Sequence, residues 1–156
     1  MPNQVPEGYH TVTPALTVKH GAEAIEFYKR AFGAQEVMRM NNPDGKIMHA
    51  EIKVGDSRIM LNDEMPDMGC LSPASVGGPT GSLYLYVPDV DAAFQRAVTA
   101  GAKVLMPVTD MFWGDRFGQV EDSSGHRWSL ATHVEDLAPE EIAQRHREFL
   151  ASVAKK

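Results

Sequence analysis

An internal repeat constrains the fold of this chain more than any other feature of its sequence. The segment VTPALTVKHGAEAIEFYKRAFGAQEV in the first half is similar to GSLYLYVPDVDAAFQRAVTAGAKVL in the second. Val18 corresponds to Val87 (87 − 18 = 69), and Arg58 corresponds to Arg127 at the same offset. A chance likeness would not return to the same offset, so we expect two copies of one structural unit.

Each copy has the pattern of a strand, an amphipathic helix and further strands. Apolar residues recur at helical spacing from Ala24 to Phe32 and again from Ala93 to Val98, and a Gly-Ala pair follows each helix. Beyond the first helix, HAEIKV and SRIMLN alternate apolar and polar residues on either side of Gly55 and Asp56. This alternation around a short turn predicts a β-hairpin.

The order of these elements predicts an α+β fold built from two βαβββ modules, which together form one structural domain. Residues 9–63 form the first module and residues 82–135 the second. Residues 64–81, rich in Pro, Gly, Ser and Met, are expected to link the modules. Residues 136–156 are expected to form a C-terminal helix, because Pro139 and two glutamates suit its first turn.

Composition excludes several classes of function. The formal net charge of −6 argues against a protein that binds nucleic acid, which would need a basic surface. No apolar run approaches the roughly 20 residues that a membrane helix needs. Cys70 is the only cysteine, and MPNQVPEGYH lacks the basic start and apolar core of a signal peptide. We therefore expect a cytoplasmic protein that binds neither nucleic acid nor membranes.

The two modules, together with TPALTV, AIEFYKRAFGA and FWGDRFGQVEDSSGHRWSLATH, resemble the vicinal-oxygen-chelate superfamily. This superfamily includes glyoxalase I, bleomycin-resistance proteins and extradiol dioxygenases, and the resemblance over about residues 9–136 is closest to its PhnB-like branch. The resemblance implies that the two modules form a U-shaped mixed sheet around a cleft. It also implies a homodimer, and the sequence leaves open whether each cleft lies within one chain or between two.

Metal-using members of the superfamily place four ligands on the cleft face. The resemblance assigns these positions to Thr13, Met60, Ser82 and Ser129, which the repeat relates in two pairs at the offset of 69. Neutral hydroxyls and a thioether are poor ligands for divalent metal ions, which prefer imidazole, carboxylate or thiolate groups. We therefore expect no metal and no other cofactor.

Strand alternation predicts which side chains line the cleft. Tyr84 and Tyr86 share the face of Ser82, and Asn62 shares the face of Met60, so all three are candidate ligand-binding residues. Trp113 precedes the next predicted strand, and Arg116 lies at its start. Trp113 suits stacking on a flat ligand and Arg116 suits an anionic or carbonyl group; alternatively, Arg116 pairs with neighbouring acids and Trp113 covers the core.

His49 and Glu51 are candidates for catalysis because residues two apart on a strand share a face. As an acid–base pair, Glu51 would raise the basicity of His49. As an ordinary feature, the two residues belong to a polar strand face or a dimer contact.

Two functions remain open. The first is a PhnB-like protein of the glyoxalase/bleomycin-resistance family, free of metal, that binds a small, flat molecule in an aromatic-lined cleft. The second is a lyase or isomerase-type enzyme that uses His49 and Glu51, with or without a divalent metal ion.

Overall fold

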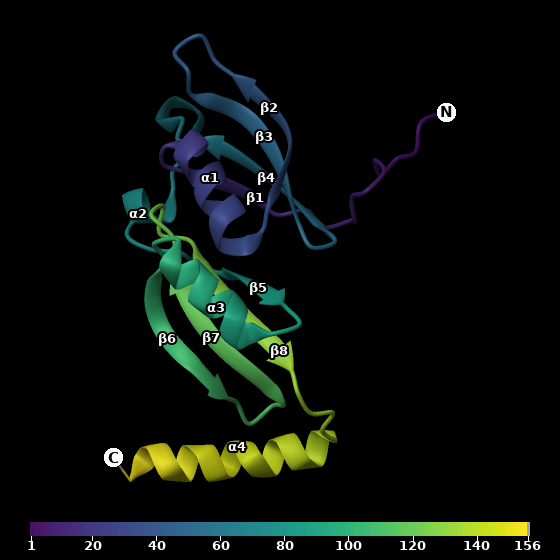
Figure 1. The fold of residues 1–156 in the computed structure, drawn as a ribbon, viewed down its shortest axis with the longest axis vertical. Helices are drawn as coiled ribbons and strands as arrows, with labels where there is room; N and C mark the ends of the chain where they lie inside the picture. The colour runs from purple at the N-terminus through teal and green to yellow at the C-terminus, as the bar shows by residue number, and fades with distance from the viewer. Residues whose placement is uncertain (156) are drawn as a thin grey trace.

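The computed structural model describes residues 1–155, which fold into two modules with the same order of elements (Figure 1). The first module consists of β1 (Ala15–Val18), α1 (Gly21–Phe32), β2 (Gln35–Asn41), β3 (Ile47–Val54) and β4 (Ser57–Asp63). The second consists of β5 (Ser82–Tyr86), α3 (Val90–Thr99), β6 (Lys103–Asp110), β7 (Asp115–Glu121) and β8 (Arg127–His133).

Between the modules, the chain forms a short 3-10 helix, η1 (Pro66–Met68), and a single helical turn, α2 (Pro73–Val76). After the second module comes α4 (Pro139–Ala154), which lies beyond the end of that module in Figure 1. No helix among residues 1–155 is both long enough and apolar enough to cross a membrane.

Each module contains one four-stranded mixed sheet, with the strand orders β1-β4-β3-β2 and β5-β8-β7-β6. The first strand of each module pairs in parallel with the last, and the other pairings are antiparallel. The predicted α+β class with two βαβββ modules is therefore confirmed. Within the described part of the chain, no strand pairing joins the two sheets.

Helices α1 and α3 each cover one face of their own sheet and contact each other where the modules meet. We call the uncovered face of each sheet its open face. The core lies on the helix side and continues across the junction, because Trp128 of β8 packs against the first module. Its ring centroid lies 5.1 Å from that of Tyr28 and 4.5 Å from that of Phe32, both in α1.

A buried carboxylate, Asp122, joins the modules at this junction. It accepts hydrogen bonds from the Tyr28 hydroxyl (2.6 Å) and from the indole nitrogen of Trp128 (2.9 Å). The backbone N–H groups of Ser124 and His126 also donate to it. Asp122 therefore shapes its own turn and binds α1 of the other module, as expected of a buried acid that must be fully paired.

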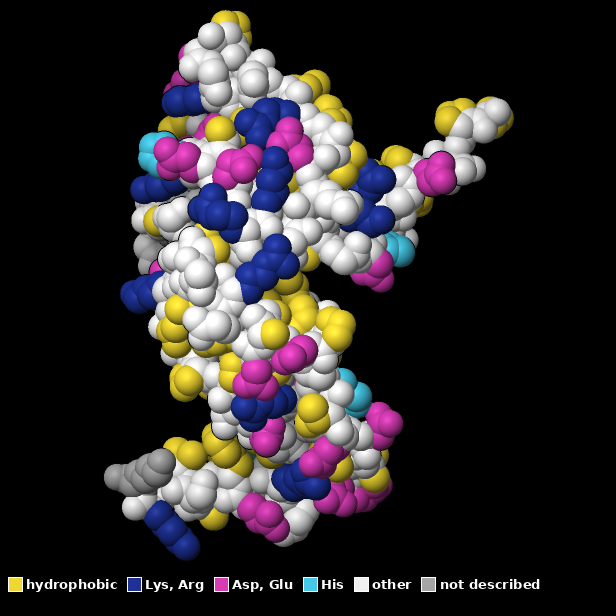
Figure 2. Space-filling view, in the orientation of Figure 1, with side chains coloured by type: hydrophobic (Ala, Val, Ile, Leu, Met, Phe, Trp, Pro, Cys, Tyr) yellow, Lys and Arg dark blue, Asp and Glu magenta, His cyan; other side chains and the backbone are white. Residues whose placement is uncertain are grey.

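The same β7–β8 turn contacts the first module at two further points. The backbone N–H of Lys19 donates to Ser124 Oγ (2.8 Å), and His126 Nε2 lies 2.7 Å from the carbonyl oxygen of Thr17. The space-filling view shows the two modules as a continuous body along this junction (Figure 2). The junction therefore combines an apolar core with a rim of hydrogen bonds.

The repeat is also visible in how each main helix begins. The backbone N–H of Gly21 donates to the Asp63 carboxylate (2.6 Å), and the backbone N–H of Val90 donates to Thr132 Oγ1 (2.9 Å). Both the donors and the acceptors are 69 positions apart. The last strand of each module thus satisfies a free N–H in the first turn of its helix, although the side chains differ.

Tyr28→Phe tests the junction. The variant removes one hydrogen bond to a buried carboxylate and keeps the ring, so we expect the free energy of unfolding to fall by about 1–3 kcal/mol, measured by urea denaturation. Tyr86→Phe is the matched control, because its exposed hydroxyl binds a carboxylate that keeps three other donors. Equal stability of Tyr28→Phe and the native protein would contradict the role given to Asp122.

Candidate functional site

Four aromatic side chains gather on the open face of the second sheet. Tyr84 and Tyr86 are 41% and 66% exposed, and their ring centroids lie 5.2 Å apart. Phe117 stacks on Tyr84 at 5.6 Å, and Trp113 meets Phe117 edge-on at 5.9 Å. We call these four residues the aromatic platform; it contains three of the side chains that the sequence predicts to bind a ligand.

The platform is held by Asp115, which begins β7 and is only 2% exposed. A single carboxylate oxygen accepts hydrogen bonds from the hydroxyls of Tyr84 (2.8 Å) and Tyr86 (3.0 Å) and from the indole N–H of Trp113 (3.1 Å). Three aromatic rings from two separate segments therefore point their polar ends at one buried acid.

The second oxygen of Asp115 binds His133, the last residue of β8. Its Nδ1 lies 2.9 Å from Asp115, and its Nε2 lies 2.8 Å from Asp136. The two carboxylates raise the pKa of His133 above its usual value. Burial alone would raise the pKa of Asp115, but the hydrogen bonds from His133 and the platform outweigh burial and lower it. Asp115 therefore stays ionised beneath the rings.

A tight turn places Trp113 and Asp115 side by side. Gly114 between them has φ +101°, and a Cβ there would collide with the backbone oxygen of Glu135. The Gly114 carbonyl accepts hydrogen bonds from the N–H groups of Val134 and Glu135. Only glycine combines this positive φ with so close an approach of two backbones, so Gly114 fixes the geometry of the platform.

Arg116, the remaining candidate from this segment, lies on the helix side of β7. It binds both carboxylate oxygens of Asp91 at 2.8 and 2.9 Å and also contacts Asp110 at 3.1 Å. These acids raise the pKa of its guanidinium group. The structure therefore does not bring Arg116 to the platform, because its position on the strand alternates with that of Asp115.

The open face of the first sheet carries ionisable side chains instead of aromatic ones. His49 Nε2 lies 3.2 Å from Glu51 Oε1, so the structure brings the predicted pair into contact. The Tyr9 hydroxyl, and then His49 and Arg58, lower the pKa of Glu51 despite partial burial. Asn62 lies on the same sheet and uses its amide N–H groups on Thr17 and on the backbone of Asp63.

The sequence pattern gives no role to Tyr9, which lies before the repeated segment that starts at Val12. Nor does the sequence predict the central role of Asp115, which lies two residues after Trp113. Its donors come from elements that are distant in the sequence, so no local pattern predicts that they converge.

The four positions that correspond to family metal ligands lie in two pairs, one in each module, and Thr13 precedes β1 instead of lying on it. Met60 sits beside the start of β1, where its N–H donates to the Pro14 carbonyl (2.9 Å). The Thr13 hydroxyl donates to a backbone carbonyl, and Ser129 Oγ accepts from Gln119 at 3.1 Å. Three neutral hydroxyls and a thioether do not fit a divalent metal ion. Among residues 1–155, no group of three or more His, Cys, Asp or Glu side chains is placed to hold one.

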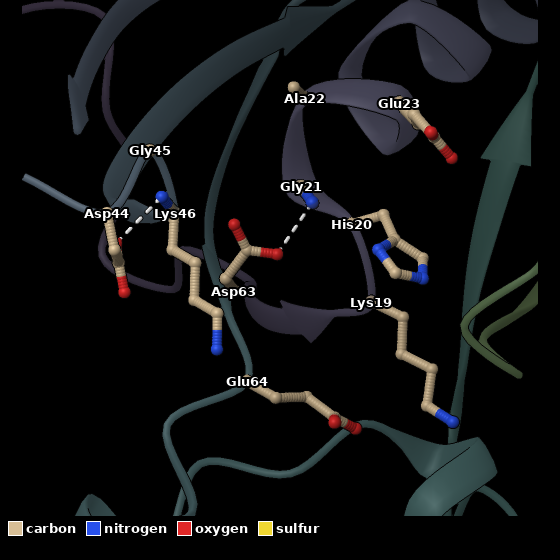
Figure 3. A pocket seen from close by; sticks show the side chains of 10 residues that line it. All are labelled: Lys19, His20, Gly21, Ala22, Glu23, Asp44, Gly45, Lys46, Asp63 and Glu64. Carbon is tan, nitrogen blue, oxygen red and sulfur yellow. Dashed lines mark hydrogen bonds between the residues drawn. The ribbon is translucent and has the colours of Figure 1, made fainter. Parts of the chain in front are cut away.

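A hollow of about 560 Å³ lies at the first turn of α1 (Figure 3). Asp63 is the buried acid in its wall, and its two oxygens accept from the backbone N–H groups of Gly21 (2.6 Å) and Ile47 (2.7 Å). Both oxygens are therefore already engaged in holding the helix start and β3. This explains Asp63 as a structural residue.

Comparison with known proteins agrees with this architecture. The family model described as Glyoxalase/Bleomycin resistance protein/Dioxygenase superfamily matches residues 9–130. An uncharacterized protein of Mycobacterium bovis is 44% identical over 134 residues, which cover 84% of this chain and 88% of that protein.

Two solved structures extend the comparison. TioX from Micromonospora sp. ML1 is 25% identical with a TM-score of 0.61, and the match covers 83% of this chain and 100% of that one. A Bacillus cereus protein described as a PhnB protein is 21% identical with a TM-score of 0.60, covering 79% and 99% of the two chains. At the latter identity the likeness shows the fold alone.

The pKa of His133 gives a test of the site's electrostatics. Because its pKa in the folded protein lies above the usual value of 6.5, the stabilisation from its pairing is complete below about pH 6.5 and disappears as the pH rises through the folded pKa. The native protein should therefore exceed His133→Gln in free energy of unfolding at about pH 5.5, and the difference should shrink as the pH rises through the folded pKa.

Urea denaturation at several pH values measures the free energy of unfolding, and NMR titration of the imidazole measures the pKa of His133. Asp136→Asn is the control variant, and it should lower the pKa of His133. An imidazole pKa at or below its usual value in the native protein would be inconsistent with the arrangement described.

Proposed function

The chain belongs to the glyoxalase/bleomycin resistance protein/dioxygenase superfamily, and on this premise we propose that it is a PhnB-like protein that binds a small, flat, aromatic molecule without a metal ion. The observation that carries this proposal is the aromatic platform held on Asp115. Aromatic rings prefer offset-stacked or edge-to-face partners, and each such pair stabilises a complex by about 0.5–1.5 kcal/mol beyond the area buried.

The chemistry of the platform favours a flat and largely uncharged ligand. The carboxylate beneath the rings is ionised, and four donors already occupy its two oxygens. The exposed surface is therefore aromatic, and the half-exposed His133 beside it has both ring nitrogens occupied by Asp115 and Asp136. A flat ring without charge would match this surface.

Support for a metal-free protein comes from the four positions that correspond to family metal ligands. Thr13, Met60, Ser82 and Ser129 supply neither imidazole nor carboxylate. The likeness to a PhnB protein in fold and the motifs shared with that branch favour this subgroup.

We further propose that the protein is a cytoplasmic homodimer that binds neither nucleic acid nor membranes. Large apolar side chains are exposed on both open faces, among them Met38 and Met40 on the first sheet and Tyr84 and Tyr86 on the second. Exposed apolar groups of this kind favour association. If the first sheet of one copy lies opposite the second sheet of another, the ionisable and aromatic faces line one cleft. The formal net charge of −6 disfavours nucleic acid as a partner.

The contact between His49 and Glu51 supports a second candidate, a lyase or isomerase-type enzyme acting with or without a divalent metal ion. With its pKa lowered, Glu51 stays ionised and holds the imidazole of His49, which would then serve as the acid–base group. The side chain of His49 remains about one-third exposed and is accessible to a substrate. In that case His49→Gln would abolish turnover and leave binding to the platform intact.

Binding to the platform is tested with 1-naphthol, a flat aromatic alcohol, by calorimetric titration. Tyr84→Ala removes one stacking ring, so we expect affinity to fall about tenfold. Tyr84→Phe keeps the ring and should bind within about threefold of the native protein. Equal affinity for native protein and Tyr84→Ala would count against the platform as the binding site.

Metal content is tested by elemental analysis after growth in medium supplemented with manganese, iron, nickel and zinc. The four side chains supply no anionic or imidazole donor, so we expect each metal at well below one ion per chain. A stoichiometric divalent ion that survives dialysis would overturn the metal-free proposal.

A further inference from the structure

Tyr9 lies against the open face of the first sheet, although it precedes the repeated segment that starts at Val12. It precedes β1 in a segment that otherwise extends away from the first module (Figures 1 and 2). The Arg58 guanidinium lies over the Tyr9 ring, 5.2 Å from its centroid. Burial, and after it the Glu51 carboxylate, raises the pKa of the Tyr9 hydroxyl. A phenol thus covers Arg58 and Glu51, and His49 lies beside Glu51.

The approach of this segment depends on Gly8. Gly8 has φ +83°, and a Cβ there would lie 2.8 Å from Arg58 Nη2 and 3.0 Å from its Nε. A side chain would therefore meet both conformational strain and the guanidinium group. Gly8 therefore allows the backbone to pass close to Arg58, and this path places the Tyr9 ring against the sheet.

The fit of Tyr9 is nevertheless incomplete. Its hydroxyl oxygen is buried without a hydrogen bond of good geometry, and so is Nε of Arg58. A buried polar atom without a partner is unfavourable, so displacement of Tyr9 would return its hydroxyl to water and leave Arg58 Nε free to donate to a better-placed partner group. A free phenol can adjust its position beside Glu51, whereas Tyr9 is constrained by the chain on either side.

We infer that Arg58, Glu51 and His49 form a subsite for a phenolic ring, and that Tyr9 is its built-in occupant, which a ligand displaces. This inference rests on the proposed function, because it adds a second aromatic-binding surface to the proposed cleft. The Arg58 guanidinium stacks on the ring of the ligand, and the Glu51 carboxylate accepts a hydrogen bond from the hydroxyl group of the ligand. The ligand class is a neutral phenol, since a phenolate would be repelled by Glu51.

The test uses p-cresol, the side chain of tyrosine as a free molecule, in NMR titrations of labelled native protein and Tyr9→Ala. Loss of the built-in ring should create a saturable site with shifts at Glu51 and Arg58 and an affinity at least about tenfold higher than in the native protein. Gly8→Ala displaces the segment by another route and should give a gain in the same direction. His10→Ala, at the exposed neighbouring position, should behave as the native protein does.

Two further variants identify the binding groups. Arg58→Ala and Glu51→Gln, each combined with Tyr9→Ala, should lose the gain, and toluene should bind the Tyr9→Ala variant more weakly than p-cresol. Equal p-cresol affinity in native protein and Tyr9→Ala would overturn the inference, as would shifts confined to the second sheet. If 1-naphthol did not bind the platform but Tyr9→Ala still gained affinity for p-cresol, only the proposed function would be overturned.

Discussion

The rest of the structure depends on the burial of one charged group, Asp122, between the two modules. A carboxylate removed from water is costly unless hydrogen bonds surround it, and here four donors do so. Because one donor is Tyr28 of the other module, Asp122 can be satisfied only when the modules meet in this arrangement. The apolar contacts of Trp128 bury surface area at the junction, and the hydrogen bonds of Asp122 fix the orientation of one module relative to the other.

Strand β7 is bracketed by two buried acids, Asp115 at its start and Asp122 just beyond its end. They are seven positions apart, so strand alternation directs them to opposite faces of the sheet. Asp122 turns toward the helices and joins the modules, while Asp115 turns toward the open face and holds the aromatic platform. The acid that joins the modules and the acid that holds the platform therefore lie at the two ends of one strand.

The sequence predicts the modules well because the repeat is long and the alternation of apolar residues is regular. Alternation also places Tyr84 and Tyr86 correctly on the face opposite the helices. Arg116 shows the limit of this reasoning: its partner Asp91 lies on a helix 25 positions away, and no local pattern reveals the pairing. Tyr9 escapes for the same reason, since its contacts depend on the path of an irregular segment.

The two modules share the same backbone arrangement but carry different side chains on their open faces. By strand register, Phe117 stands where the first module has His49, and Gln119 stands where it has Glu51. One open face thus carries ionisable groups and the other carries aromatic rings. The two faces would make different and complementary contributions to any ligand that touched both.

Each ring on the second sheet with a polar tip is bound through that tip to the same acid, and this has a consequence for selectivity. To swing aside, Tyr84 or Trp113 would have to leave the Asp115 anion with one partner fewer. The side chains of the aromatic platform are thereby held in place before a ligand binds, so binding would cost little rotamer entropy. If the platform binds a ligand as proposed, so rigid a surface would select by shape: planar ligands would gain full contact, whereas puckered or branched ligands could not induce the rings to adapt.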